Sequence, residues 1–145
     1  MARASQDYNP TQALLQRTVF SAGEASLTAD KLVPFDNLPI TGEVIVYARS
    51  KKALGEEPDF MLISKKKGEV SIVDLKKNPK KVLELFSGAR LIGYDIKKIL
   101  HIFLRENVDA PIIEHDIQVG AFLINSLQRD TGFTDLAGNE LGYEG

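Results

Sequence analysis

The chain contains no cysteine, and this excludes several kinds of site at once. Without thiols there are no disulfides, no thiolate zinc ligands and no cysteine nucleophile, and a reducing cytoplasm is the compartment we expect. No apolar run approaches the roughly 20 residues of a membrane helix. The opening stretch, MARASQDYNP, lacks the apolar core of a secretory signal. These absences predict a soluble, cytoplasmic protein that does not bind a membrane.

Common nucleotide-binding and hydrolase motifs are missing as well. The sequence holds no Gly-x-Gly-x-x-Gly loop, no Walker pattern and no Gly-x-Ser-x-Gly elbow. His101 and His115 are single histidines without a nucleophile and base beside them, so histidine catalysis is not favoured. We therefore expect no cofactor.

The chain is long enough for one well-filled core and too short for two ordinary domains, with 145 residues of which 43% are hydrophobic. Residues 21–42, SAGEASLTADKLVPFDNLPITG, are rich in Ser, Thr, Gly, Asp and Pro, which is typical of a linker. We predict a partly disordered linker or lead-in over residues 1–41 and one domain over residues 42–145.

Charge is distributed unevenly along the chain. From Arg49 to Lys98 there are 13 Lys/Arg and 7 Asp/Glu, whereas from Glu106 to Gly145 there are 1 and 8. The lysines of the basic middle could neutralise phosphates. Because no aromatic residues interleave with them, a solvated surface that protects edge strands is the favoured interpretation. The clustered lysines are Lys65, Lys66, Lys67, Lys76, Lys77, Lys80 and Lys81.

The first half of the domain has the pattern of a meander followed by a short helix. GEVIVYARS has a β-rich core, and DFMLISKKKGEVSIVDL places two apolar runs around a Lys-Lys-Lys-Gly turn. Asn78 and Pro79 suit the N-cap and first position of a helix of two to three turns, which Gly88 closes. Three antiparallel strands and a helix are predicted.

The second half alternates strands with helices. An apolar stripe at helical spacing predicts a helix packed on a sheet, with Asp95 as its cap. APIIEHD is a short strand candidate, and IQVGAFLINSLQ is apolar nearly all round, which predicts a buried helix. FTDLAGNELGYEG has Thr134 as a candidate cap. The order β-β-β-α-β-α-β-α predicts an α/β mixed sheet flanked by helices. The stripe consists of Ile96, Ile99, Leu100, Phe103 and Leu104.

Three segments carry a resemblance to a known family. LIGYDIKKILHIFLRENV, IIEHDIQVGAFLINSLQ and DLAGNELG, in this order and spacing, resemble the 3′-5′ exonuclease domain of bacterial family A DNA polymerases, the DNA polymerase I type. The resemblance runs from about Val44 to Gly142. It implies a ribonuclease-H-like mixed sheet with three antiparallel strands followed by parallel strands.

The resemblance also implies which positions would hold metal. Active members use carboxylates to hold two divalent ions. The family's Asp-x-Glu motif falls on Tyr47 and Arg49, the acid of its second motif falls on Ile99, and Asp95 stands where the family has asparagine. Its third motif would lie beyond Gly145, so the domain is expected to be truncated at its C-terminus. None of the three substitutes can replace a carboxylate.

These residues predict a degenerate exonuclease-like domain with no catalytic, cofactor-binding or metal-binding residue. By the resemblance, we expect a monomeric structural spacer that contacts neighbouring polymerase domains, with DNA reached through the parent polymerase and at most weakly by the domain itself. One alternative is an active nuclease with displaced ligands, Asp95, Glu114 and Asp116, with His115 beside them. Asp116 also suits the cap of the following helix. Another alternative is a protein-binding adaptor that uses the acidic C-terminal third.

Three aromatic residues at strand ends have two interpretations. Tyr47, Phe60 and Tyr94 could stack on bases, but single aromatics in such places more often form the edge of a core.

Overall fold

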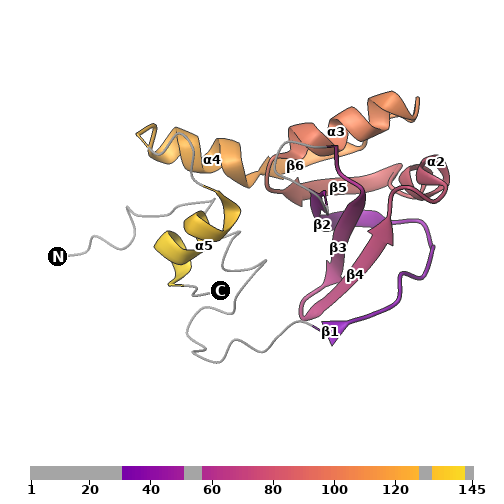
Figure 1. The fold of residues 1–145 in the computed structure, drawn as a ribbon, viewed down its shortest axis with the longest axis horizontal. Coiled ribbons are helices and arrows are strands. Elements are labelled where there is room, and N and C mark those ends of the chain that lie inside the picture. The colour runs from indigo at the N-terminus through magenta and orange to yellow at the C-terminus, as the bar shows by residue number, and fades with distance from the viewer. Residues whose placement is uncertain (1–30, 51–56, 128–131, 143–145) are drawn as a thin grey trace. The chain divides into compact units, whose positions relative to one another are not determined.

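A computed structural model describes residues 31–50, 57–127 and 132–142. Predictions for residues 1–30 and for the last three residues lie outside the described residues. The chain divides after Asp116 into two compact units, and each is described by itself (Figure 1).

The first unit is built on a mixed sheet whose strand order is β1-β4-β3-β2-β5-β6 (Figure 1). β2 and β4 both pair with β3 in antiparallel fashion, whereas β5 pairs in parallel with β2 and β6. The predictions of a three-stranded meander and a mixed sheet are therefore confirmed, and the order agrees with a ribonuclease-H-like fold. The strands are β1 (Lys31–Leu32), β2 (Thr41–Arg49), β3 (Phe60–Lys66), β4 (Glu69–Asp74), β5 (Gly88–Gly93) and β6 (Ile112–Asp116).

One face of this sheet is covered by two helices, α2 (Pro79–Glu84) and α3 (Ile96–Arg105). Phe86, just beyond α2, meets Phe103 of α3 edge to face with ring centroids 6.1 Å apart, a geometry that aromatic pairs prefer. The core between helices and sheet includes alternate residues of β2, because successive side chains of a strand point to opposite faces.

Some details of these helices differ from the sequence-based predictions. Gly88 does not close α2, which ends at Glu84; it opens β5 instead. On α3, Leu104 is 73% exposed and Ile102 is buried. Each residue turns an α-helix by about 100°, so Leu104, five residues after Ile99, lies about 140° away from it around the helix axis. The buried stripe of α3 is therefore narrower than the predicted stripe, which included Leu104.

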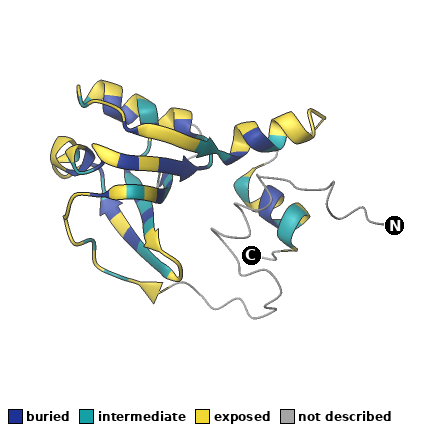
Figure 2. Cartoon of the chain, turned by 180° about the vertical axis from the view of Figure 1, so that it is seen from behind, coloured by how far each residue is buried: buried dark blue, intermediate teal, exposed yellow. Residues whose placement is uncertain are grey.

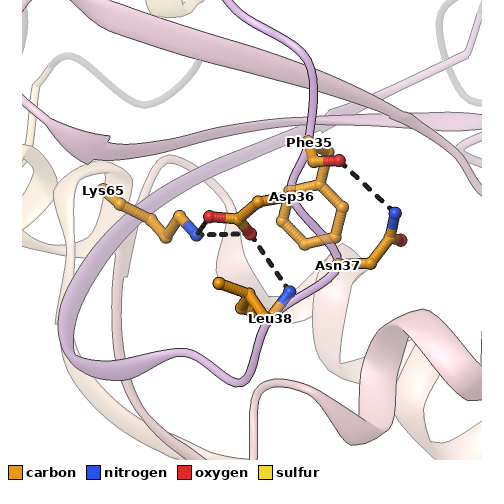
Figure 3. A network of polar contacts seen from close by, with 5 residues as sticks. All are labelled: Phe35, Asp36, Asn37, Leu38 and Lys65. Atoms are coloured by element: carbon orange, nitrogen blue, oxygen red, sulfur yellow. Dashed lines mark hydrogen bonds and ion pairs between the residues drawn. The ribbon is translucent and has the colours of Figure 1, made fainter.

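The segment that connects β1 to β2 is held by polar contacts (Figure 3). The Asp36 carboxylate accepts hydrogen bonds from Lys65 Nζ at 2.7 and 2.8 Å and from the Leu38 amide at 3.1 Å. Ile40, at the end of this segment, is buried in the core. Structure thus begins upstream of Gly42 within the described residues, while the proposed division at residue 42 stays a prediction.

The Asp36–Lys65 ion pair predicts a pH-dependent effect on stability. The hydrogen bond from Lys65 holds the pKa of Asp36 below its usual value of 3.8, and the bond from Leu38 acts in the same direction. A depressed pKa stabilises the fold above the pKa of the unfolded chain, and this contribution is lost as pH falls through the folded-state pKa. We expect Asp36→Asn to be slightly less stable than wild type at pH 7, and the difference to vanish in strong acid. Urea unfolding at both pH values measures it.

The second unit contains two helices among its described residues, α4 (Ile117–Ile124) and α5 (Phe133–Leu141). The prediction of a buried helix is wrong for α4: only Ile117 and Gly120 are buried, and much of the helix is exposed (Figure 2). A helical segment that is apolar on all sides indicates that another surface must bury it, but the sequence does not identify that surface. Thr134 lies inside α5, which Gly132 caps. Among the described residues, no helix has both the length and the apolarity to cross a membrane.

Candidate functional site

The carboxyl ends of four strands lie at one end of the sheet. β2, β5 and β6 are mutually parallel, and β4 shares their direction because both β2 and β4 run antiparallel to β3. Open α/β sheets commonly bind ligands at this end. Tyr47, Arg49, Asp95 and Asp116 all lie at or just beyond these strand ends.

Ile99 lies in the interior and not in a cleft. Its side chain is 1% exposed and belongs to the same apolar cluster as Val46 of β2 and Phe103 of α3. A carboxylate here would lose its hydration without gaining a partner. This position therefore contributes to packing and offers no ligand to a metal.

Tyr47 and Arg49 lie on the other side of β2. Val46 and Ala48 face the core that contains Ile99, so strand alternation points Tyr47 and Arg49 away from it. Tyr47 is half-buried and Arg49 is exposed. The expectation that Tyr47, Arg49 and Ile99 mark one common site is therefore wrong, because a sequence alignment does not fix which face of a strand a residue occupies.

Asp95 occupies the N-cap position of α3, as predicted, but its side chain does not cap the helix. Its backbone is left-handed, with φ of 53°, and its carboxylate accepts a hydrogen bond from Lys98 Nζ, 2.8 Å away. This bond raises the pKa of Lys98 against the opposing effect of desolvation; the nearby Tyr47 and Tyr94 raise it further. Asp95 is thus paired with a cation that would compete with any metal.

Asp116 supplies the cap that Asp95 does not. Its Oδ2 accepts a hydrogen bond from the Ile96 amide, the first of α3, at 2.9 Å. The observed bond is thus at the preceding helix, α3, whereas the predicted role at the following helix, α4, stays a prediction. The bond ties the end of β6 to the start of α3 and satisfies an amide that the helix itself leaves without a partner.

This cap gives a prediction about stability. We expect Asp116→Ala to lower the free energy of unfolding by about 1 kcal/mol, because the half-buried Ile96 amide loses its acceptor. Asp116→Asn keeps a carbonyl oxygen in place and should lose less. Urea denaturation of the three proteins measures the difference, and equal losses for both variants would show that the capping bond is unimportant.

Glu114, another member of the displaced-ligand alternative, is paired with an arginine. Glu114 accepts a hydrogen bond from Arg90 at 3.1 Å, and Arg90 also reaches Glu43 at 3.6 Å. In the part of the chain that the structure describes, no three His, Asp or Glu side chains gather closely enough to hold a metal ion. The geometry therefore gives no support to a site built from Asp95, Glu114, His115 and Asp116.

Sequence reasoning missed a surface hollow beside α3. It has a volume of about 370 Å³ and is lined in part by Lys98, His101 and Arg105, which recur at helical spacing. Arg105 bonds both Glu106 and Glu57, whose hydrogen bonds and charges raise its pKa. The spacing of the three basic residues could have revealed this face, but not the acids that neutralise it.

Some lysines of the predicted clusters form ion pairs with acidic residues, and others do not. Lys65, Lys66 and Lys76 form ion pairs with Asp36, Glu69 and Asp59 respectively. The other lysines of the α2 region are exposed and form no ion pair with a described residue; they are Lys77, Lys80 and Lys81. The basic surface is thus concentrated around the start of α2.

Comparisons with known proteins do not assign the chain to a family. No family model matches the sequence, and no curated protein matches it. A solved structure with a similar fold is the Aedes aegypti Nibbler EXO domain, with 12% sequence identity and a TM-score of 0.49. The similarity covers 72% of this chain and 61% of that one. A likeness of this size carries no information about the chemistry of this chain.

Proposed function

We propose that this chain is a catalytically inactive exonuclease-like domain that serves as a structural spacer in a DNA polymerase of the polymerase I type. The observation that carries the proposal is the burial of Ile99, 1% exposed, where the family resemblance implies a metal-binding acid. Two-metal hydrolysis needs carboxylates around the ions. A hydrocarbon at Ile99, in the apolar cluster that also contains Val46 and Phe103, removes one of these carboxylates and adds to the core.

The acids that remain at the strand ends also support inactivity. Asp95 is paired with Lys98, Asp116 accepts the Ile96 amide, and Glu114 is paired with Arg90. Each carboxylate would have to give up an existing partner before binding a cation, and Lys98 would repel the cation. The proposal therefore explains why acids persist here without forming a metal site.

A spacer must contact its neighbours, and α4 offers a surface for this. Phe122 is 44% exposed, Leu123 76% and Ile124 55%. Clusters of exposed apolar residues commonly mark contacts with other proteins. The adaptor alternative would use the same exposed apolar surface, but its partner would not be a polymerase. Sequencing the parent gene beyond Gly145 separates the two, because the spacer requires a polymerase there.

A nuclease assay tests the loss of activity. The purified chain is incubated with a 5′-labelled single-stranded oligonucleotide in Mg²⁺ or Mn²⁺, with a parallel reaction in excess chelator. We expect the same substrate length in all reactions. Shortening that requires the metal and is abolished by chelation would contradict the proposal and favour the displaced-ligand alternative.

A further inference from the structure

Helix α4 has apolar residues on two opposite faces. Ile117 and Gly120 lie on one face and are buried. Val119, Phe122 and Leu123 recur at i, i+3 and i+4, so they share the other face. Their side chains are 53%, 44% and 76% exposed, respectively. This second face is therefore an apolar surface that the described part of the chain leaves open.

The charges of the second unit indicate what kind of segment would cover this face. Burying apolar surface is favourable by roughly 25 cal/mol per Å², and α4 itself carries no charged residue. Asp135 and Glu140 of α5 are the charged residues in the described part of this unit, and both are acids. The occupant that fits is an apolar segment that carries positive charge and no acid.

The chain itself contains such a segment outside the described residues. Residues 11–20, TQALLQRTVF, include five apolar residues, and Arg17 is the only charged residue among them. Residues 21–30 separate this segment from β1, and ten residues reach up to about 35 Å when extended. A tether of this length raises the effective concentration of the segment at α4 to the order of millimolar.

A second copy of the chain fits the same face less well. Two copies that met through α4 would each bring Asp135 and Glu140 to the complex. Like charges that face one another across an interface oppose binding. A second copy would also lack the effective concentration that the tether gives. Charge and chain connection therefore both favour residues 11–20.

We propose that residues 11–20 bind the exposed face of α4 formed by Val119, Phe122 and Leu123, with their own apolar side chains against it. A neighbouring protein then reaches this face only by displacing the segment, so residues 11–20 control docking at α4. The inference goes beyond the proposed function and does not depend on it, because the contact forms within the isolated chain and needs neither a polymerase nor a nucleic acid.

A spin label tests the contact in the full chain. Because the chain has no cysteine, Gln16→Cys provides a single attachment site within the segment and removes no apolar side chain. We expect a nitroxide at this position to broaden the NMR signals of the α4 amides, compared with the same sample after the nitroxide is reduced. Signals of α4 that are equally sharp in both samples would overturn the proposal.

A mixed sample tests whether a second copy is the occupant. Chain that carries the nitroxide but no ¹⁵N is mixed with ¹⁵N-labelled chain that carries no nitroxide. We expect sharp α4 signals in the mixture, since the proposed contact lies within one chain. Broadened α4 signals in the mixture would overturn the proposal in favour of a dimer formed through α4.

Matched substitutions test whether apolar contact holds the segment. In the spin-labelled chain, Leu14→Ser combined with Leu15→Ser should lower the docking equilibrium constant about tenfold or more. Thr11→Ser combined with Gln12→Ser, in the same segment, should leave the broadening unchanged. Leu123→Ser removes apolar surface from α4 itself and should weaken docking without unfolding the chain, because this side chain is exposed. Unchanged broadening in both leucine variants would refute the apolar contact.

Discussion

Replacing Ile99 with aspartate is expected to destabilise the domain strongly. The side chain is 1% exposed in an apolar core, so the variant places a carboxylate where no cation or donor group is available. Breaking the packing and burying an unpaired acid together should lower the free energy of unfolding by about 4 kcal/mol. Urea denaturation monitored by circular dichroism measures the loss.

The pH dependence of this variant identifies the cause. Burial raises the pKa of an introduced carboxyl group. A raised pKa means that the folded state tolerates the neutral acid and that stability is lost as pH rises above the pKa of the unfolded chain. Ile99→Asp should therefore be closer to wild type at pH 4 than at pH 8. A loss that does not depend on pH would indicate damage from shape alone.

Leu104→Asp is the matched control on the same helix. Leu104 is 73% exposed, so the new carboxylate stays hydrated. The free energy of unfolding of Leu104→Asp should remain within about 0.5 kcal/mol of the wild-type value. If Ile99→Asp were as stable as Leu104→Asp, Ile99 would not lie in the core, and the site could still accept an acid.

Substituting Gly93 by alanine is expected to have the second large effect. A Cβ at this position would lie 2.3 Å from the Val46 carbonyl oxygen, which is backbone and cannot rotate away. β5 must therefore move away from β2 at the end of the sheet where the candidate site lies. We expect a loss of about 3 kcal/mol in the free energy of unfolding.

Gly88→Ala tests whether this cost is specific. Gly88 is at the other end of β5, where a Cβ would meet the Ile40 carbonyl oxygen at 3.3 Å, a tight contact without a severe clash. The strand and the chemical change are the same, so differences in β propensity cancel. Thermal unfolding of both variants should show the larger loss for Gly93→Ala, and equal losses would argue against a close approach of β2 and β5.

Period and turn residues were sufficient to predict most elements of the sheet unit, but not β1, which lies within the predicted linker. The Lys-Lys-Lys-Gly turn placed β3 and β4, and Gly68 at that turn has a left-handed φ of 79°. Asn78 and Pro79 placed the start of α2 for the same local reason. Such signals act within a few residues, and the sequence contains them completely.

The candidate site was harder to predict because it depends on contacts between distant segments. Asp116 caps α3 from 20 residues away, and the phase of β2 that turns Tyr47 away from Ile99 is set by the whole sheet. The exposure of α4 shows the same limit, since apolar composition alone does not say what surface covers a helix. Long-range pairing, and not local propensity, determines these features.

The proposed inactivity requires that the chain does not bind divalent cations, and calorimetry tests this most directly. Mn²⁺ is titrated into the full chain at neutral pH in a buffer that does not chelate metal. The account predicts only the heat of dilution. Saturable heat, lost in Asp95→Asn or Asp116→Asn, would contradict it by showing that the acids at the strand ends release their partners to hold a metal.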